Sequence, residues 1–201
     1  MAAMQFDDDE YCAGALSLDF VNTLGGDRAG ATNEKLGQYG DLLDWLAHAG
    51  ALPRTRIARL EALAKAGPDA ADRLMRRARA FREALFAVFD AVRRHKAPAP
   101  AALEIVNGEI ARANSHARLV RGGHHLRWDW DDENALDTPL WPIAREAGEL
   151  LTSDKLGRLA ECSGDTCGWL FLDLTKNHSR RWCDMKGCGN RAKVRRYRGK
   201  V

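Results

Sequence analysis

Residues 162–191 read CSGDTCGWLFLDLTKNHSRRWCDMKGCGNR and hold four of the five cysteines of this 201-residue chain. The cysteines form two pairs of equal spacing, Cys162-x4-Cys167 and Cys183-x4-Cys188, about fifteen residues apart. Two short loops that each present two thiolates can fill the tetrahedral shell of one ion. An all-cysteine ligand set prefers zinc or iron–sulfur to hard cations. The alternatives are two disulfides or free thiols.

The beginning of the chain argues against an oxidising compartment. Residues 1–10 are acidic, and no apolar segment of a signal peptide follows them. We therefore expect a cytoplasmic protein, in which disulfides rarely persist. The pattern then predicts one structural zinc ion on the four cysteines, because four protein thiolates leave no open position for an activated water.

Other potential ligands are weaker candidates. Cys12 is remote in sequence, and we expect it to lie far from the other cysteines as a small buried hydrophobic residue. His178 lies between the two pairs, but four cysteines already satisfy zinc. His124 and His125 are adjacent at a predicted turn and are interpreted as surface residues.

Residues 182–191 resemble the CGNR zinc finger, which is named for the run that stands here at residues 188–191. The resemblance extends upstream through Cys162, Cys167 and residues 168–171. Near the N-terminus, residues 18–23 (LDFVNT) are similar to the opening motif of the larger domain that accompanies this finger. The family is described as stress-induced transcription regulators, so the resemblance implies DNA binding.

The charge is distributed unevenly along the chain. The formal net charge is +3, but residues 176–201 contain ten Lys or Arg and only one Asp. The rest of the chain is therefore acidic on balance. Such asymmetry favours an anionic partner for the C-terminal segment. The alternative is a solvated basic terminus.

A final helix after Cys188 would organise most of these cations. Its predicted rows are Arg191, Arg195 and Arg198 on one side, with Lys193, Arg196 and Lys200 on the other. A narrow apolar seam of Val194, Tyr197 and Val201 would dock between them, and Asn190 would cap the helix. The predicted nucleic-acid contacts are Lys176, Arg180, Arg181, Asn190, Arg191, Lys193, Arg195, Arg196 and Arg198.

The remaining chain predicts a mainly helical fold with a small antiparallel β element. Apolar residues recur at three- and four-residue steps over residues 41–49, 55–66, 69–96, 101–114 and 138–151. Alternating residues around Gly122-Gly123 indicate a β-hairpin. We expect an α+β regulatory or dimerisation domain over residues 1–155. A treble-clef-like or knuckle-type zinc finger would follow over residues 156–201.

Asp19 and Asn22 are the polar residues of the N-terminal motif and would share one face of a helix. They could line a ligand pocket or form a polar clamp on the following loop, since buried polar groups require hydrogen-bond partners.

The sequence thus predicts a zinc-containing, DNA-binding transcription regulator that could form a homodimer and take a small-molecule or protein effector on its N-terminal domain. The alternative is a zinc-stabilised module that binds protein or RNA. We expect no enzyme, since no nucleophile–base pair, phosphate loop or open metal site stands out. We also expect no membrane span, because no apolar run approaches eighteen residues.

Overall fold

The computed structural model describes residue 6 and residues 10–26, 33–131 and 135–198. Its elements, in chain order, are α1 (Leu16–Val21), β1 (Leu24–Gly25), β2 (Asn33–Glu34), α2 (Tyr39–His48), α3 (Arg54–Ala66), α4 (Pro68–Arg93), α5 (Pro100–His116), β3 (Ala117–Gly122), β4 (His125–Trp130), α6 (Leu140–Leu151), the 3-10 helix η2 (Asp154–Arg158), β5 (Leu159–Glu161), β6 (Leu170–Leu172), the π-helical turn η3 (Met185–Gly189) and α7 (Asn190–Arg198). The strands form three antiparallel pairs, so the predicted α+β class is confirmed.

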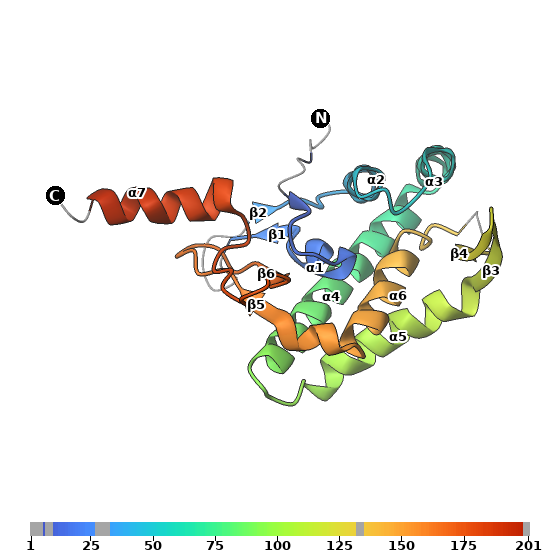
Figure 1. Ribbon diagram of the computed structural model, residues 1–201. Coiled ribbons are helices and arrows are strands. Elements are labelled where there is room, and N and C mark those ends of the chain that lie inside the picture. The colour runs from blue at the N-terminus through green and yellow to red at the C-terminus, as the bar shows by residue number, and fades with distance from the viewer. Residues whose placement is uncertain (1–5, 7–9, 27–32, 132–134, 199–201) are drawn as a thin grey trace.

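Helix α4 lies at the centre of the helical body and contacts α1, α2, α3, α5 and α6 (Figure 1). Pro68 begins the helix at a position where its missing N–H costs nothing. The predicted apolar stripe is buried, from Leu74 through Phe81 to Phe89. This stripe packs against α1, where the rings of Phe20 and Phe81 lie 5.9 Å apart.

The predicted helix over residues 69–96 ends three residues early. His95 adopts a left-handed φ of 55°, and its N–H donates to the Val92 carbonyl while Lys96 N–H donates to that of Ala91. These two bonds are a Schellman motif, which satisfies the last carbonyls of a helix and stops it. The sequence signal was weak, because glycine is the usual residue at this position.

The predicted hairpin is confirmed as β3 and β4, with Leu119 opposite Trp128 and Arg121 opposite Leu126. Its turn lies at Gly123-His124, one residue later than predicted, and Gly123 supplies the positive φ of 68°. The base of the hairpin is buried, since Trp130 packs against Trp141 of α6.

Strands β5 and β6 attach the C-terminal segment to the helical body. Leu170, Phe171 and Leu172 are all buried, and β6 contacts α1 while β5 contacts α4. The strand ends at Leu172, and the side chain of Leu174 beyond it is 62% exposed. The division into residues 1–155 and 156–201 stays a prediction.

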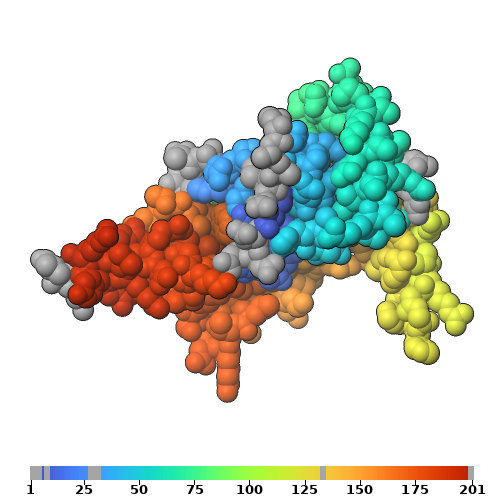
Figure 2. Space-filling model, turned by 90° about the horizontal axis from the view of Figure 1, so that it is seen from above, coloured from blue at the N-terminus to red at the C-terminus, as the bar shows by residue number. Residues whose placement is uncertain are grey.

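Helix α7 projects from the molecule at the end opposite the β3–β4 hairpin (Figures 1 and 2). It has no buried residue. The expected docked seam is therefore wrong, because Val194 and Tyr197 are 48% and 76% exposed; Val201 lies outside the described residues. Within the described ranges, no helix has both the length and the apolar character needed to cross a membrane.

Candidate metal centre and nucleic-acid interface

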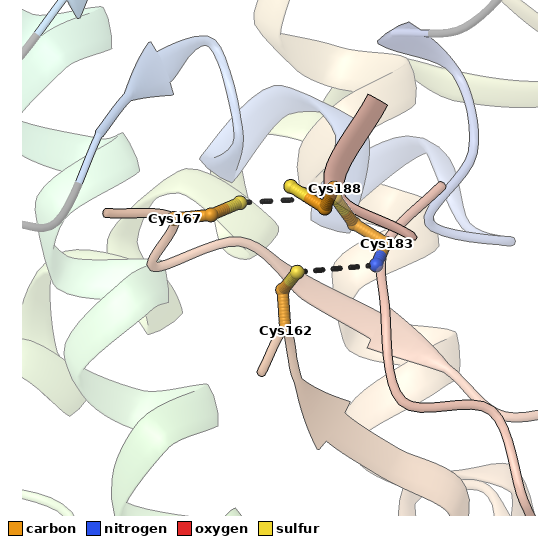
Figure 3. A group of neighbouring side chains, drawn as sticks. All are labelled: Cys162, Cys167, Cys183 and Cys188. Atoms are coloured by element: carbon orange, nitrogen blue, oxygen red, sulfur yellow. Dashed lines mark hydrogen bonds between the residues drawn. The ribbon is translucent and has the colours of Figure 1, made fainter. Parts of the chain in front are cut away.

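The four paired cysteines converge on one point (Figure 3). Cys162 follows strand β5, and Cys167 lies in the loop before β6. Cys183 precedes the turn η3, and Cys188 lies within it. All four sulfur atoms lie within 4.8 Å of one another. The two pairs therefore build one cluster, as their spacing predicted.

The separations within the cluster match tetrahedral zinc. Cys167 Sγ lies 3.7 Å from Cys183 Sγ, which in turn lies 3.6 Å from Cys188 Sγ. A tetrahedron with zinc–sulfur bonds of about 2.3 Å has sulfur–sulfur edges of about 3.8 Å. A disulfide would place two sulfurs at about 2.05 Å, and all five cysteines are free.

Two hydrogen-bond donors and one glycine lie next to the cysteine sulfurs. The N–H of Cys183 donates to Cys162 Sγ at 3.3 Å, and Arg191 Nη2 donates to Cys188 Sγ at 3.0 Å. Gly164 passes so close that a Cβ there would lie 3.2 Å from Cys188 Sγ. A side chain at this position would crowd the sulfurs, so a glycine suits the close approach.

The thiols perturb one another strongly. Hydrogen bonding from Cys167, and then from Cys183, lowers the pKa of the Cys162 thiol to about 2. The same bond raises the pKa of Cys167 to about 12. The pKa of Cys183 is also raised, first by its hydrogen bond with Cys12 and then by those with Cys162 and Cys167. Four thiolates at this separation require a cation, and the cluster fits one structural Zn²⁺ held by Cys162, Cys167, Cys183 and Cys188.

Cys12 does not lie where the sequence suggested. It is half-buried, and Arg180 Nη2 donates both to its carbonyl and to that of Cys183. The reason is a long-range backbone pairing, in which Leu172 N–H donates to the Ala13 carbonyl at 2.8 Å. This bond brings the segment before α1 alongside β6, next to the zinc cluster. In the sequence, only the presence of a cysteine at position 12 indicated a place beside the zinc cluster.

Arg180 braces the second cysteine pair. Its guanidinium donates to the carbonyls of Trp182 at 3.0 Å and of Cys12 at 2.8 Å, and also to that of Cys183. The group lies 4.4 Å from the centre of the Phe171 ring. These contacts occupy the guanidinium, so we do not expect Arg180 to contact nucleic acid.

The loop between the two cysteine pairs is closed by Asp173. Its Oδ1 accepts the N–H of Thr175 at 3.0 Å and its Oδ2 accepts the N–H of Arg180 at 2.9 Å. Lys176 and Arg181 are exposed on this loop. His178 contacts Arg158 and takes no part in the cysteine cluster.

The expected N-cap at Asn190 is wrong. Asn190 is the first residue of α7 and has helical angles, φ −65° and ψ −45°, whereas an N-cap residue is extended. The capping side chain is that of Asp184, which accepts the N–H of Gly187 at the start of η3. Turn and helix are continuous, so the side chain that caps them lies before the turn.

The two predicted rows of α7 point in different directions. Arg191 is bound to Cys188, and Arg195 forms an ion pair with Asp165 in the loop of the first pair. At 100° per residue, Lys193 and Arg196 lie on the opposite side of the helix. Among the described residues neither has an acidic partner, and both are exposed. Arg198 is exposed near the tip.

Asp19 and Asn22 lie at the junction between α1 and the zinc finger. Asn22 exchanges two hydrogen bonds with the backbone of Leu170, at 2.9 and 3.0 Å. Asp19 Oδ1 accepts the N–H of Ala13 at 2.9 Å. Burial raises the pKa of Asp19 from 3.8 to about 7, opposed by that hydrogen bond. Both side chains hold segments of the chain together at this junction.

Comparison with known proteins agrees with this geometry. A family model described as "Putative stress-induced transcription regulator" matches residues 14–154, and a model of the CGNR zinc finger matches residues 158–200. A search of curated proteins gives no match. Because the first model spans more than half of the chain, this protein belongs to the family that the first model describes, and its residues 158–200 match a CGNR zinc finger.

Proposed function

We propose that this protein is a cytoplasmic regulator that binds DNA through helix α7, oriented by the zinc centre below it. The observation that carries the proposal is the outward row of Lys193 and Arg196. These cations stand on a helix with no buried residue that projects from the body (Figure 2). Phosphate contacts need exposed cations that are not neutralised within the protein.

The other row of α7, with Arg191 and Arg195, contacts the zinc finger and supports the proposed orientation of the helix. Arg191 ties the first turn of α7 to a zinc ligand, and Arg195 ties its next turn to Asp165. Both contacts would fix the direction of the helix relative to the metal. The outward cations would then meet the phosphates with little loss of conformational freedom.

Lys176 and Arg181 would add contacts from the loop between the cysteine pairs, since both are exposed. One such module would bury only about 600–1,000 Å² of protein surface on DNA. We therefore also propose that two copies act together at a site. The role is one of binding and not of catalysis, because four protein thiolates close the zinc shell.

A pair of double variants tests the proposal. Lys193→Ala with Arg196→Ala removes two outward cations, whereas Arg73→Ala with Arg76→Ala removes two exposed cations from α4. Both variants lose the same charge, so a general electrostatic effect is common to them. Affinity for a mixed-sequence duplex is measured by fluorescence anisotropy over a series of salt concentrations.

We expect the α7 variant to bind less tightly, with a salt slope flatter by about 0.9 for each lost phosphate contact. The α4 variant should resemble wild type. Equal affinity of both variants and wild type would refute the α7 interface. Retained binding to RNA or to an acidic protein, without duplex binding, would favour the interaction-module alternative.

A further inference from the structure

The fifth cysteine borders the zinc centre from outside. Cys12 and Cys183 both line an open hollow of about 420 Å³, together with Arg180, Trp182 and Met185. Cys12 is half-buried, whereas Cys183 is only 3% exposed. A small solute in the hollow would therefore meet Cys12 as the more accessible of the two cysteines.

The backbones of these two cysteines are held together independently of their thiols. One nitrogen of Arg180, Nη2, donates to the carbonyls of both Cys12 and Cys183. On the other side of Cys12, the Ala13 carbonyl accepts the N–H of Leu172. β6 and the arginine thus hold the two backbones beside each other, and a disulfide requires neighbouring backbones of this kind.

The cysteine beside Cys12 is one of the four zinc ligands. Cys183, which shares the Arg180 donor and the hollow with Cys12, is a member of the four-sulfur cluster. A cysteine held beside a zinc ligand in an open hollow is placed to form a disulfide with it when a peroxide enters.

We propose that Cys12 and Cys183 form a disulfide on reaction with a peroxide and that the disulfide releases the zinc ion. Peroxide first oxidises the Cys12 sulfur to a sulfenic acid, and its O–O bond breaks with loss of one water. The Cys183 sulfur then attacks the Cys12 sulfur, the S–O bond breaks, and the hydroxide takes a proton from the solvent and leaves as a second water. Two sulfurs give up two electrons, and the peroxide accepts both.

The metal leaves because the disulfide consumes one of its four ligands. Three thiolates do not complete the closed shell that a structural zinc requires. The inference rests on the zinc centre and the position of Cys12, and it does not depend on nucleic-acid binding. Its outcome can therefore differ from that of the DNA-binding test.

The experiment compares the zinc-loaded full chain with its Cys12→Ser variant. Each is treated with hydrogen peroxide in the presence of a chromogenic zinc chelator, and the products are digested and mapped by mass spectrometry without reduction. Melting temperature and zinc content before treatment establish that the variant is folded and loaded. Cys12 is not a zinc ligand in the cluster, so both should equal wild type.

We expect wild type to release its zinc together with the appearance of a Cys12–Cys183 peptide pair, and dithiothreitol with added zinc to restore the starting protein. Cys12→Ser should release zinc several-fold more slowly. Release from the variant at the wild-type rate would overturn the proposal. So would disulfides confined to Cys162, Cys167, Cys183 and Cys188.

Discussion

The side chain of Asn22 pairs with the backbone of Leu170 in both directions. Its Nδ2 donates to the Leu170 carbonyl at 2.9 Å, and its Oδ1 accepts the Leu170 N–H at 3.0 Å. The Asn22 amide therefore pairs with the edge of β6 that does not face β5, as a neighbouring strand would. It connects the N-terminal motif to the zinc finger across 148 residues of sequence.

Replacement of Asn22 by Ala should weaken the contact between α1 and the zinc finger. The buried N–H and carbonyl of Leu170 would lose their partners, and each unsatisfied group costs about 1–3 kcal/mol. We expect a clear loss in the free energy of unfolding, measured by urea denaturation of the zinc-loaded protein. Asn107→Ala, at an exposed position of α5, is the matched control. Equal stability of the two variants would contradict the clamp.

Arg180 gives a second prediction, on the zinc finger itself. Arg180→Ala leaves three carbonyls without their charged donor, so the melting temperature should fall and zinc should pass faster to a chelator. Arg181→Ala removes a neighbouring exposed cation and should change neither quantity. Arg180→Lys should rescue only in part, because an ammonium lacks the planar fork of a guanidinium. If Arg180→Ala matched Arg181→Ala, the bracing role would be wrong.

The metal content provides a third prediction. Purified protein should carry close to one zinc per chain, and Cys188→Ser should lose most of it, since the closed shell needs all four thiolates. Cys12→Ser should retain its zinc. Elemental analysis of the three proteins checks both statements. Recovery of two disulfides and no metal from a reducing cytoplasm would refute the zinc assignment.

Asp19 should make stability depend on pH in a particular direction. Its folded-state pKa of about 7 exceeds the ordinary 3.8, so the folded protein holds this proton more tightly than the unfolded chain. The resulting stabilisation is complete below the lower value and is lost as pH rises toward 7. The free energy of unfolding should fall by at most about 1.4 kcal/mol per pH unit.

The test is the difference between wild type and Asp19→Asn in urea denaturation from about pH 5.5 to 8. Protonation of the zinc ligands acts with the opposite sign, but it is common to both proteins and cancels in the difference. The asparagine can still accept the Ala13 N–H. Wild type should lose stability relative to the variant as pH rises. Parallel curves would show that Asp19 titrates outside this window.

The sequence was informative wherever the signal is local. The stripe from Leu74 to Phe89 predicted a buried helix face, and the equal spacing of the two cysteine pairs predicted one cluster. Periodicity and ligand spacing are properties of neighbouring residues, so they survive without knowledge of the fold.

Long-range pairings could not be predicted in this way. Nothing near Cys12 indicates that Ala13 pairs with β6, and nothing near Arg180 distinguishes its guanidinium from that of the exposed Arg181. The same applies to Arg82, an α4 residue only 2% exposed that bonds Glu34 at 2.6 Å and Thr23 at 3.1 Å. Charge counting treats all such arginines as surface cations, although packing selects some of them as internal braces.

Binding of the zinc-loaded wild-type protein to a mixed-sequence DNA duplex, as a function of salt between about 50 and 200 mM, tests the central claim most directly. With Lys193 and Arg196 on phosphates, the plot of log affinity against log salt should fall with a slope of about −2 or steeper. Removal of zinc should abolish this binding, because α7 then loses the support that orients it. A flat plot, or no binding in low salt, would contradict the account.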